Sequence, residues 1–114
     1  MKIGFCAPLD KIALVAAGGF DYIEPPMNAM AAWTEAEFEA LFPAVKDAQI
    51  PVSSFNCMFP GEMQLLSRDT EDREIIRYLR TVFSRVQRLG GAVAVFGSGR
   101  SRRRPEGMGY GEAF

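Results

Sequence analysis

Four short apolar segments, separated by helical patterns, constrain the fold of this 114-residue chain more than any other feature. The expected strands span residues 2–7, 20–25, 50–56 and 92–97. Loop-forming residues follow each segment, which is typical of parallel strands covered by helices. Four such βα units form either half of an eight-stranded barrel or a small open sheet. The length fits a single domain, residues 1–114, with a modest core.

Three helices are predicted between these strands. The first covers residues 9–17 and stops at a Gly-Gly pair, which favours the end of a helix. The second begins with a capping box at Thr34, and Pro43 predicts a kink or two short segments. The third is capped by Thr70, and its acidic first turn and basic last turn complement the helix dipole. Methionine and aromatic side chains of the loops after the second and third strands are expected to pack over the sheet: Met27, Met30, Trp33, Met58, Phe59 and Met63.

The composition excludes several classes of protein. No apolar run approaches the roughly 20 residues of a membrane-spanning helix, and the N-terminus lacks a secretory signal pattern. We therefore expect a cytoplasmic protein that does not bind membranes. Cys6 and Cys57 lie in or beside apolar segments and are expected to be buried, reduced thiols. Histidine is absent, so any catalysis must use carboxylate, Arg, Lys, Tyr or Cys side chains.

Charge is distributed unevenly along the chain. Residues 1–67 hold three lysines and eight acidic residues, whereas residues 68–114 hold ten arginines and six acidic residues. Opposite fields at the two ends favour head-to-tail self-association or an anionic ligand near the C-terminal end. The cluster Arg100, Arg102, Arg103 and Arg104 suits either phosphates or a solvated, salt-bridged loop. Since the cluster lacks interleaved aromatic residues and the net charge is −1, nucleic acid is not expected as a partner.

Two polar residues mark the ends of expected strands. Glu24 ends the second strand, where it could bind a sugar hydroxyl or act as a base, or pair with a nearby arginine. Asn56 ends the third strand, where it could bind a polar ligand or hold the following loop in an Asx turn. Glu24 is therefore the candidate catalytic residue, and Asn56 is a candidate substrate-binding residue.

The end of the fourth strand is a candidate anion site. Consecutive glycines expose backbone N–H groups, and an arginine adds a planar donor for phosphate or carboxylate. The spacing matches neither a P-loop nor a dinucleotide fingerprint, and a tight turn explains the glycines equally well. The candidate substrate-binding residues of this turn are Gly97, Ser98, Gly99 and Arg100.

Four segments, taken in order, resemble a known family. They are residues 19–24 (GFDYIE), 50–56 (IPVSSFN), 95–99 (VFGSG) and 104–107 (RPEG). Together they resemble the N-terminal half of sugar phosphate isomerase/epimerase-like proteins, which are xylose isomerase-like TIM barrels. The resemblance covers nearly the whole chain. It implies an α/β fold in which four parallel βα units form half of a (β/α)8 barrel.

The resemblance also implies an activity. Members of the family isomerise or epimerise keto sugars and related polyols by moving a proton next to a carbonyl, usually with Mn²⁺, Mg²⁺, Co²⁺ or Zn²⁺. Their metal ligands come from the second half of the barrel, so no ligand is assigned in this chain. Glu24 and residues 97–100 are implied on the substrate side. The chain alone is expected to be inactive, and the alternative function is a non-catalytic binding or assembly module.

Since the family barrel is longer than this chain, we expect either a truncated or fragmentary product or a half barrel that self-associates. Four parallel strands leave the first and the last strand unpaired and one apolar face uncovered. Two copies could join edge to edge into an eight-stranded assembly. The expected partners are therefore a sugar-like ligand and a second copy of the chain.

Overall fold

The computed structural model describes residues 1–113, which contain two short parallel sheets. In the first sheet, β1 (Gly4–Cys6) pairs with β2 (Tyr22–Glu24), so that Cys6 lies beside Glu24. In the second, β3 (Ser54–Phe55) pairs with β4 (Val93–Ala94), and Ser54 lies beside Val93. The chain is therefore a mixed helix and strand protein built on parallel pairing.

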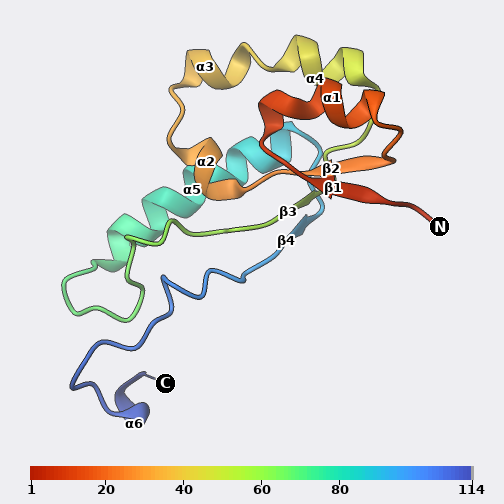
Figure 1. The fold of residues 1–114 in the computed structure, drawn as a ribbon. Helices are drawn as coiled ribbons and strands as arrows, with labels where there is room; N and C mark the ends of the chain where they lie inside the picture. The colour runs from red at the N-terminus through yellow and green to blue at the C-terminus, as the bar shows by residue number, and fades with distance from the viewer. Residues whose placement is uncertain (114) are drawn as a thin grey trace.

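Backbone contacts join the two sheets between β2 and β3. Pro26 and Asn56 form an isolated parallel bridge. The Asn56 N–H donates to the Pro25 carbonyl at 3.2 Å, and the Met27 N–H donates to the Asn56 carbonyl at 2.8 Å. These contacts place β3 beside β2, and Figure 1 shows the four strands gathered in one region of the molecule.

All four predicted strands are present, but each is only two or three residues long. Prolines explain part of the difference, because Pro25, Pro26 and Pro51 flank β2 and β3 and have no N–H to donate to a ladder. The last strand was expected over residues 92–97 and ends at Ala94. Within the described residues no strand pairs with its outer edge, so nothing there extends the ladder.

The first two helical predictions are confirmed. A 3-10 turn (Leu9–Lys11) leads into α1 (Ile12–Ala17). The second region divides into α3 (Glu35–Glu39) and α4 (Phe42–Ala48), with Pro43 in the first turn of α4. The proline is tolerated there because the first-turn N–H groups have no helical partner.

The predicted capping box starts α3. The Glu37 N–H donates to the Thr34 hydroxyl oxygen at 3.2 Å, and the Thr34 N–H donates to the Glu37 carboxylate at 2.7 Å. Both orphan donors are thereby satisfied, which is the expected function of this motif.

The third helix, α5 (Asp72–Arg88), is confirmed, but Thr70 does not cap it. Glu71 occupies the cap position, and the Thr70 hydroxyl donates to the Gln64 carbonyl at 2.8 Å. The threonine thus holds the preceding loop rather than the helix. A last short helix, α6 (Tyr110–Ala113), follows the arginine-rich segment.

Helix α2 (Met27–Ala31) was not predicted, because this segment was assigned to a loop. It is five residues long and its cap position, Pro26, makes no side-chain capping bond. Isolated helices of this length are unstable. Packing against α5 holds it, and both Met27 and Met30 are completely buried.

The helices bury one face of the strands, and the other face stays more open. Helix α1 packs against α4 and β2, and α2 packs against α5 (Figure 1). Ile23 of β2 and Phe55 of β3 point into this core and are completely buried. The core contains Leu9, Ile12, Val15, Ile23, Met27, Met30, Val52, Phe55, Val82 and Val86.

Cys6 and Cys57 are free but exposed, so the expectation that they are buried is wrong. Cys6 lies beside Glu24 in the β1–β2 register, and the helices bury the opposite side of these strands. Cys57 starts the loop after β3 and has a φ of 46°, a left-handed conformation. Neither thiol therefore contributes to the helix-covered core.

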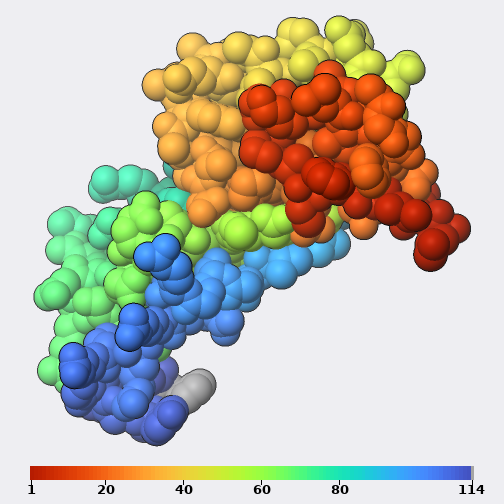
Figure 2. Space-filling model, viewed as in Figure 1, coloured from red at the N-terminus to blue at the C-terminus, as the bar shows by residue number. Residues whose placement is uncertain are grey.

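The molecule is elongated. Its radius of gyration is 16.0 Å, whereas a compact domain of this length has about 13 Å. Figure 2 shows the C-terminal segment extending from the main body beside the loop that precedes α5. Among residues 1–113, no helix is long and apolar enough to cross a membrane.

Candidate functional site

The carboxyl ends of β2 and β3 bring Glu24 and Asn56 together. The Asn56 amide Nδ2 donates to the Glu24 carboxylate Oε1 at 3.2 Å and to the Glu24 carbonyl at 3.4 Å. The Cys6 thiol donates to the same Oε1 at 3.9 Å. Within residues 1–113 no arginine or lysine forms an ion pair with Glu24, so its alternative interpretation as half of a salt bridge finds no partner there.

Hydrogen bonds join the turn after β4 both to the loop after β3 and to the arginine-rich segment. The Ser98 hydroxyl oxygen accepts a hydrogen bond from the Phe59 N–H at 2.9 Å, which ties the turn to the loop after β3. The Gly97 carbonyl accepts from Arg102, at 3.0 Å from Nε and 2.7 Å from Nη2. Ser98 has a φ of 31°, a strained value for a residue with a side chain.

A hollow of about 310 Å³ lies against this turn. Three of its lining residues are predicted binding residues: Ser98, Gly99 and Arg100. Asn28 and Cys57 complete one side, and the Asn28 N–H donates to the Cys57 carbonyl at 3.1 Å. Gly61 lies under Arg100, because a Cβ added to that glycine would be 3.4 Å from the arginine side chain.

The predicted residues therefore fall into two neighbouring groups. Glu24 and Asn56 form one pair at the strand ends, and neither lines the hollow formed by the turn. Gly97 also lies outside the lining and instead holds Arg102. Asn28 and Cys57 were missed. Their positions after strand ends are the signal in the sequence: Cys57 directly follows Asn56, and Asn28 lies two residues after a Pro-Pro pair. Only the tertiary structure shows that both line one hollow.

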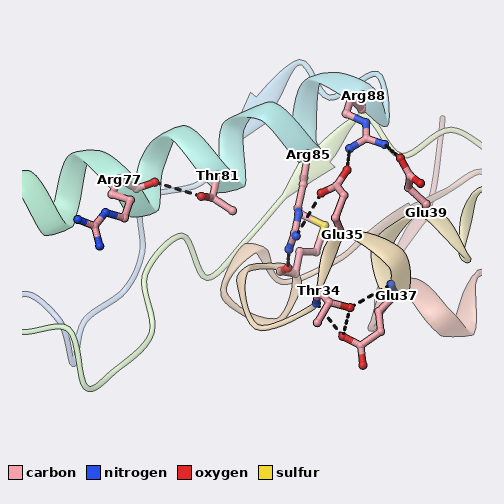
Figure 3. Close-up of polar contacts among 9 residues, drawn as sticks. Thr34, Glu35, Glu37, Glu39, Arg77, Thr81, Arg85 and Arg88 are labelled. Atoms are coloured by element: carbon pink, nitrogen blue, oxygen red, sulfur yellow. Dashed lines mark hydrogen bonds and ion pairs between the residues drawn. The ribbon is translucent and has the colours of Figure 1, made fainter.

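Two arginines of α5, Arg85 and Arg88, hold the segments that follow β2 (Figure 3), and we call this pair the charged clamp. Arg85 of α5 is almost fully buried and donates to the Met30 carbonyl at the end of α2. Arg88 donates to both Glu35 and Glu39 of α3. The Arg88 guanidinium holds the pKa of the Glu35 carboxyl below its ordinary value of 4.5.

The Phe38 ring packs against both arginines of this clamp. Its ring centroid lies 5.1 Å from the Arg85 guanidinium carbon and 4.9 Å from that of Arg88. A guanidinium stacked on a ring keeps its edge donors free for carboxylates and carbonyls. The clamp thus positions α2, whose Asn28 lines the hollow, relative to the long helix α5.

The described residues do not fit a divalent metal. Glu24 has an amide and a thiol as neighbours, whereas Mg²⁺ and Mn²⁺ prefer several oxygen ligands. No three His, Cys, Asp or Glu side chains gather at metal-binding distance within residues 1–113.

Comparison with known proteins gives a likeness of fold. No family model matches the sequence, and no curated protein matches it. The structure resembles a crystal structure of D-psicose 3-epimerase determined in the presence of D-fructose, with a TM-score of 0.65 and 22% identity. The match covers 82% of this chain and 36% of that chain, so this chain spans little more than a third of the epimerase. At this identity the likeness concerns the fold alone.

Proposed function

We propose that this chain is half of a sugar isomerase/epimerase-like barrel and binds a small sugar or polyol at the carboxyl ends of its strands. One observation carries the proposal: the hydrogen bond of 3.2 Å from Asn56 to Glu24 joins the ends of two adjacent parallel strands. Barrel enzymes of this architecture place their sites at these ends. The likeness to D-psicose 3-epimerase, determined with D-fructose, supports ketohexoses as the first ligands to test.

Glu24 is the group to which we assign proton transfer. A carboxylate beside the carbon next to a substrate carbonyl takes its proton, and the electron pair moves onto the carbonyl oxygen to give an enediolate. Return of a proton to the other face of that carbon epimerises the sugar. Return to the former carbonyl carbon isomerises it, provided that the hydroxyl proton also passes from the neighbouring oxygen to the former carbonyl oxygen. Epimerisation needs a second acid on the opposite face, which we assign to the other half of the barrel.

The remaining candidate residues are assigned to binding. Asn56 holds one oxygen of Glu24 and so orients the carboxylate, and its position at a strand end also suits a substrate hydroxyl. Residues 98–100 line the neighbouring hollow, where the Arg100 guanidinium suits a hydroxyl or an anionic end of the ligand. Gly97 supports the turn through its carbonyl rather than by contacting the ligand.

Self-association is the proposed route to a complete site. Apolar side chains remain exposed on the first and the last strand segments, including Phe5, Val93, Val95 and Phe96. Exposed strand edges favour pairing with another chain. A two-fold pair would join β4 of one copy to β1 of the other, and the negative first part of each copy would meet the positive second part of its partner.

Ligand titration tests the proposed site. We expect saturable binding of D-fructose or D-psicose that Glu24→Gln and Asn56→Leu each weaken about tenfold or more, because hydrogen bonds to charged groups contribute about 1.5–3 kcal/mol. Glu106→Gln, which changes an exposed carboxylate of the C-terminal loop, is the matched control and should bind as the wild type does. Absence of binding, or equal affinities of all three variants, would contradict the proposal.

The alternative function is a non-catalytic binding or assembly module, which the exposed apolar strand residues favour. Incubation of the sugar with the protein in D2O distinguishes the two functions. Deuterium that appears at the carbon next to the carbonyl, and is lost in Glu24→Gln, indicates proton transfer. Binding without exchange indicates a module. Sedimentation at micromolar concentration gives the oligomeric state, and a monomer would contradict the proposed pairing.

A further inference from the structure

A second cavity, away from the strand ends, lies between the arginine-rich segment and the loop that precedes α5. Its volume is about 430 Å³, within the range of small-molecule sites. Figure 2 shows this C-terminal part of the chain lying against the loop before α5. We call the cavity the arginine–aromatic pocket, and its main lining residues are Leu65, Leu66, Phe96, Arg102, Arg104 and Tyr110.

Backbone and side-chain contacts join the two segments that form this pocket. The Leu65 N–H donates to the Ser101 carbonyl at 2.9 Å, and the completely buried Ser101 hydroxyl donates to the Pro60 carbonyl at 2.8 Å. Arg68, which follows the leucine segment, and Glu112 of α6 form an ion pair of 2.9 Å. The two leucines therefore lie on a segment that is fixed at several points relative to the arginines.

Each of the two arginines lies over an aromatic ring. The guanidinium carbon of Arg102 lies 5.2 Å from the Phe96 ring centroid, and that of Arg104 lies 4.5 Å from the Tyr110 ring centroid. Backbone carbonyls hold their edges: Gly97 accepts from Arg102, and Met108 accepts from Arg104. Their orientations are thus set by the protein before any ligand arrives, which lowers the entropy lost on binding.

The charges of these arginines have no counterion in the described chain. Among residues 1–113 no carboxylate forms an ion pair with Arg102 or Arg104, and Glu112, the acid of α6, is engaged by Arg68. A guanidinium has five N–H donors. The carbonyl contacts use two donors of Arg102 and one of Arg104, so three donors of Arg102 and four donors of Arg104 remain.

We propose that the arginine–aromatic pocket binds a small amphipathic anion, a molecule that joins an apolar, flat body to a phosphate or carboxylate head. The leucines and rings provide an apolar wall for the body, and the two oriented guanidinium groups provide donors for the head. A free inorganic anion would leave the apolar wall wet, and a neutral apolar molecule would leave the two charges unpaired. The pocket is separate from the sugar site, because the two cavities share no lining residue. Their link is the Gly97 carbonyl, which accepts from Arg102.

Phenyl phosphate and benzoate are the probes. Phenol and inorganic phosphate represent the apolar body and the anionic head separately. Titrations followed by ¹H–¹⁵N spectra of the full chain should show both probes binding at least tenfold more tightly than either half. Arg104→Gln and Arg102→Gln should each weaken the probes about tenfold. Arg103→Gln is the matched control, because Arg103 lies between them in sequence but does not line the pocket, and its effect should be under twofold.

A variant of the wall keeps the test informative if an arginine variant disturbs the turn. Leu66→Asn should weaken phenyl phosphate about tenfold and leave inorganic phosphate within twofold, since it changes the apolar wall and keeps both charges. Equal effects of Arg103→Gln and Arg104→Gln would show only general electrostatic attraction and overturn the proposal. Phenol binding as tightly as phenyl phosphate, or no binding of either probe, would overturn it too. Glu24→Gln should leave probe binding unchanged, so failure here is distinguishable from failure of the sugar site.

Discussion

Gly91 lies where the end of α5 meets the strands, and replacing it by alanine should destabilise the fold. A Cβ at this position would lie 2.4 Å from the Val86 Cγ1 atom and 2.5 Å from the Phe55 Cε2 atom. Both neighbours are buried, and Phe55 has no exposed surface at all. Neither can move away without displacing other core side chains, because protein interiors are close-packed. Gly91, unlike Gly90, does not have a positive φ, so the expected effect is steric.

The expected loss follows from the cost of overpacking. One extra methyl group in a well-packed core destabilises by about 1–3 kcal/mol. With an unfolding entropy of about 2.1 cal/mol/K per residue, a chain of 114 residues has about 0.24 kcal/mol/K. Gly91→Ala should therefore lower the Tm by about 4–12 °C. Thermal unfolding followed by circular dichroism, together with urea titration at an unchanged slope, measures the change.

Gly97→Ala is the matched control for stability. No atom lies within 4 Å of its added Cβ, and its φ is not positive, so its free energy of unfolding should change by less than about 0.5 kcal/mol. Adding Val86→Ala to Gly91→Ala removes the closest clashing atom, so the double variant should lose less than the sum of the two single losses. Equal stabilities of Gly91→Ala and Gly97→Ala would refute the close approach of Val86 and Phe55 to Gly91.

Three further predictions concern the clamp, the capping box and a buried phenol. Phe38→Ala should lower the free energy of unfolding by about 3–5 kcal/mol, because the ring is completely buried beneath two guanidinium groups; urea titration measures it, and a loss below 1 kcal/mol would contradict that burial. Thr34→Ala should cost about 1 kcal/mol. The Thr34 N–H lowers the Glu37 pKa below 4.5. The stabilisation that comes from ionised Glu37 is therefore present above pH 4.5 and lost as pH falls through the lower folded value, and Glu37→Gln should flatten the fall of stability with acid. Burial, reinforced by Glu62, raises the pKa of Tyr78 to about 12, so one tyrosine should ionise late in an absorbance titration, and Tyr78→Phe should remove that step.

Local chemistry made some elements predictable from the sequence. The capping box at Thr34 uses atoms only three residues apart, and the interruption at Pro43 follows from one missing N–H. Helix α5 has an amphipathic pattern 17 residues long, which few other structures could satisfy. The meeting of Glu24 and Asn56 was also predictable in outline, because the ends of neighbouring parallel strands lie at one edge of a sheet.

Other features depend on contacts between distant segments. Helix α2 exists because α5 covers it and Arg85, 55 residues after Met30, satisfies a carbonyl at its end. Thr70 has the sequence of a cap, but its hydroxyl donates to the Gln64 carbonyl, and the cap position is taken by the next residue, Glu71. The hollow beside Arg100 joins loops after β3 and β4 through the Ser98–Phe59 hydrogen bond, which no local pattern indicates.

The open face of the strands links the proposed sugar site to the proposed pairing of chains. Glu24 and Cys6 are ladder partners on this face, and so are Ser54 and Val93. The Ser54 hydroxyl is buried without a hydrogen-bond partner, and Val93 is 54% exposed. An exposed valine forfeits its burial energy. A layer that covers this face would bury Val93, and it would enclose Glu24 in the same step. Under the proposed function, completing the fold and completing the site are therefore one event.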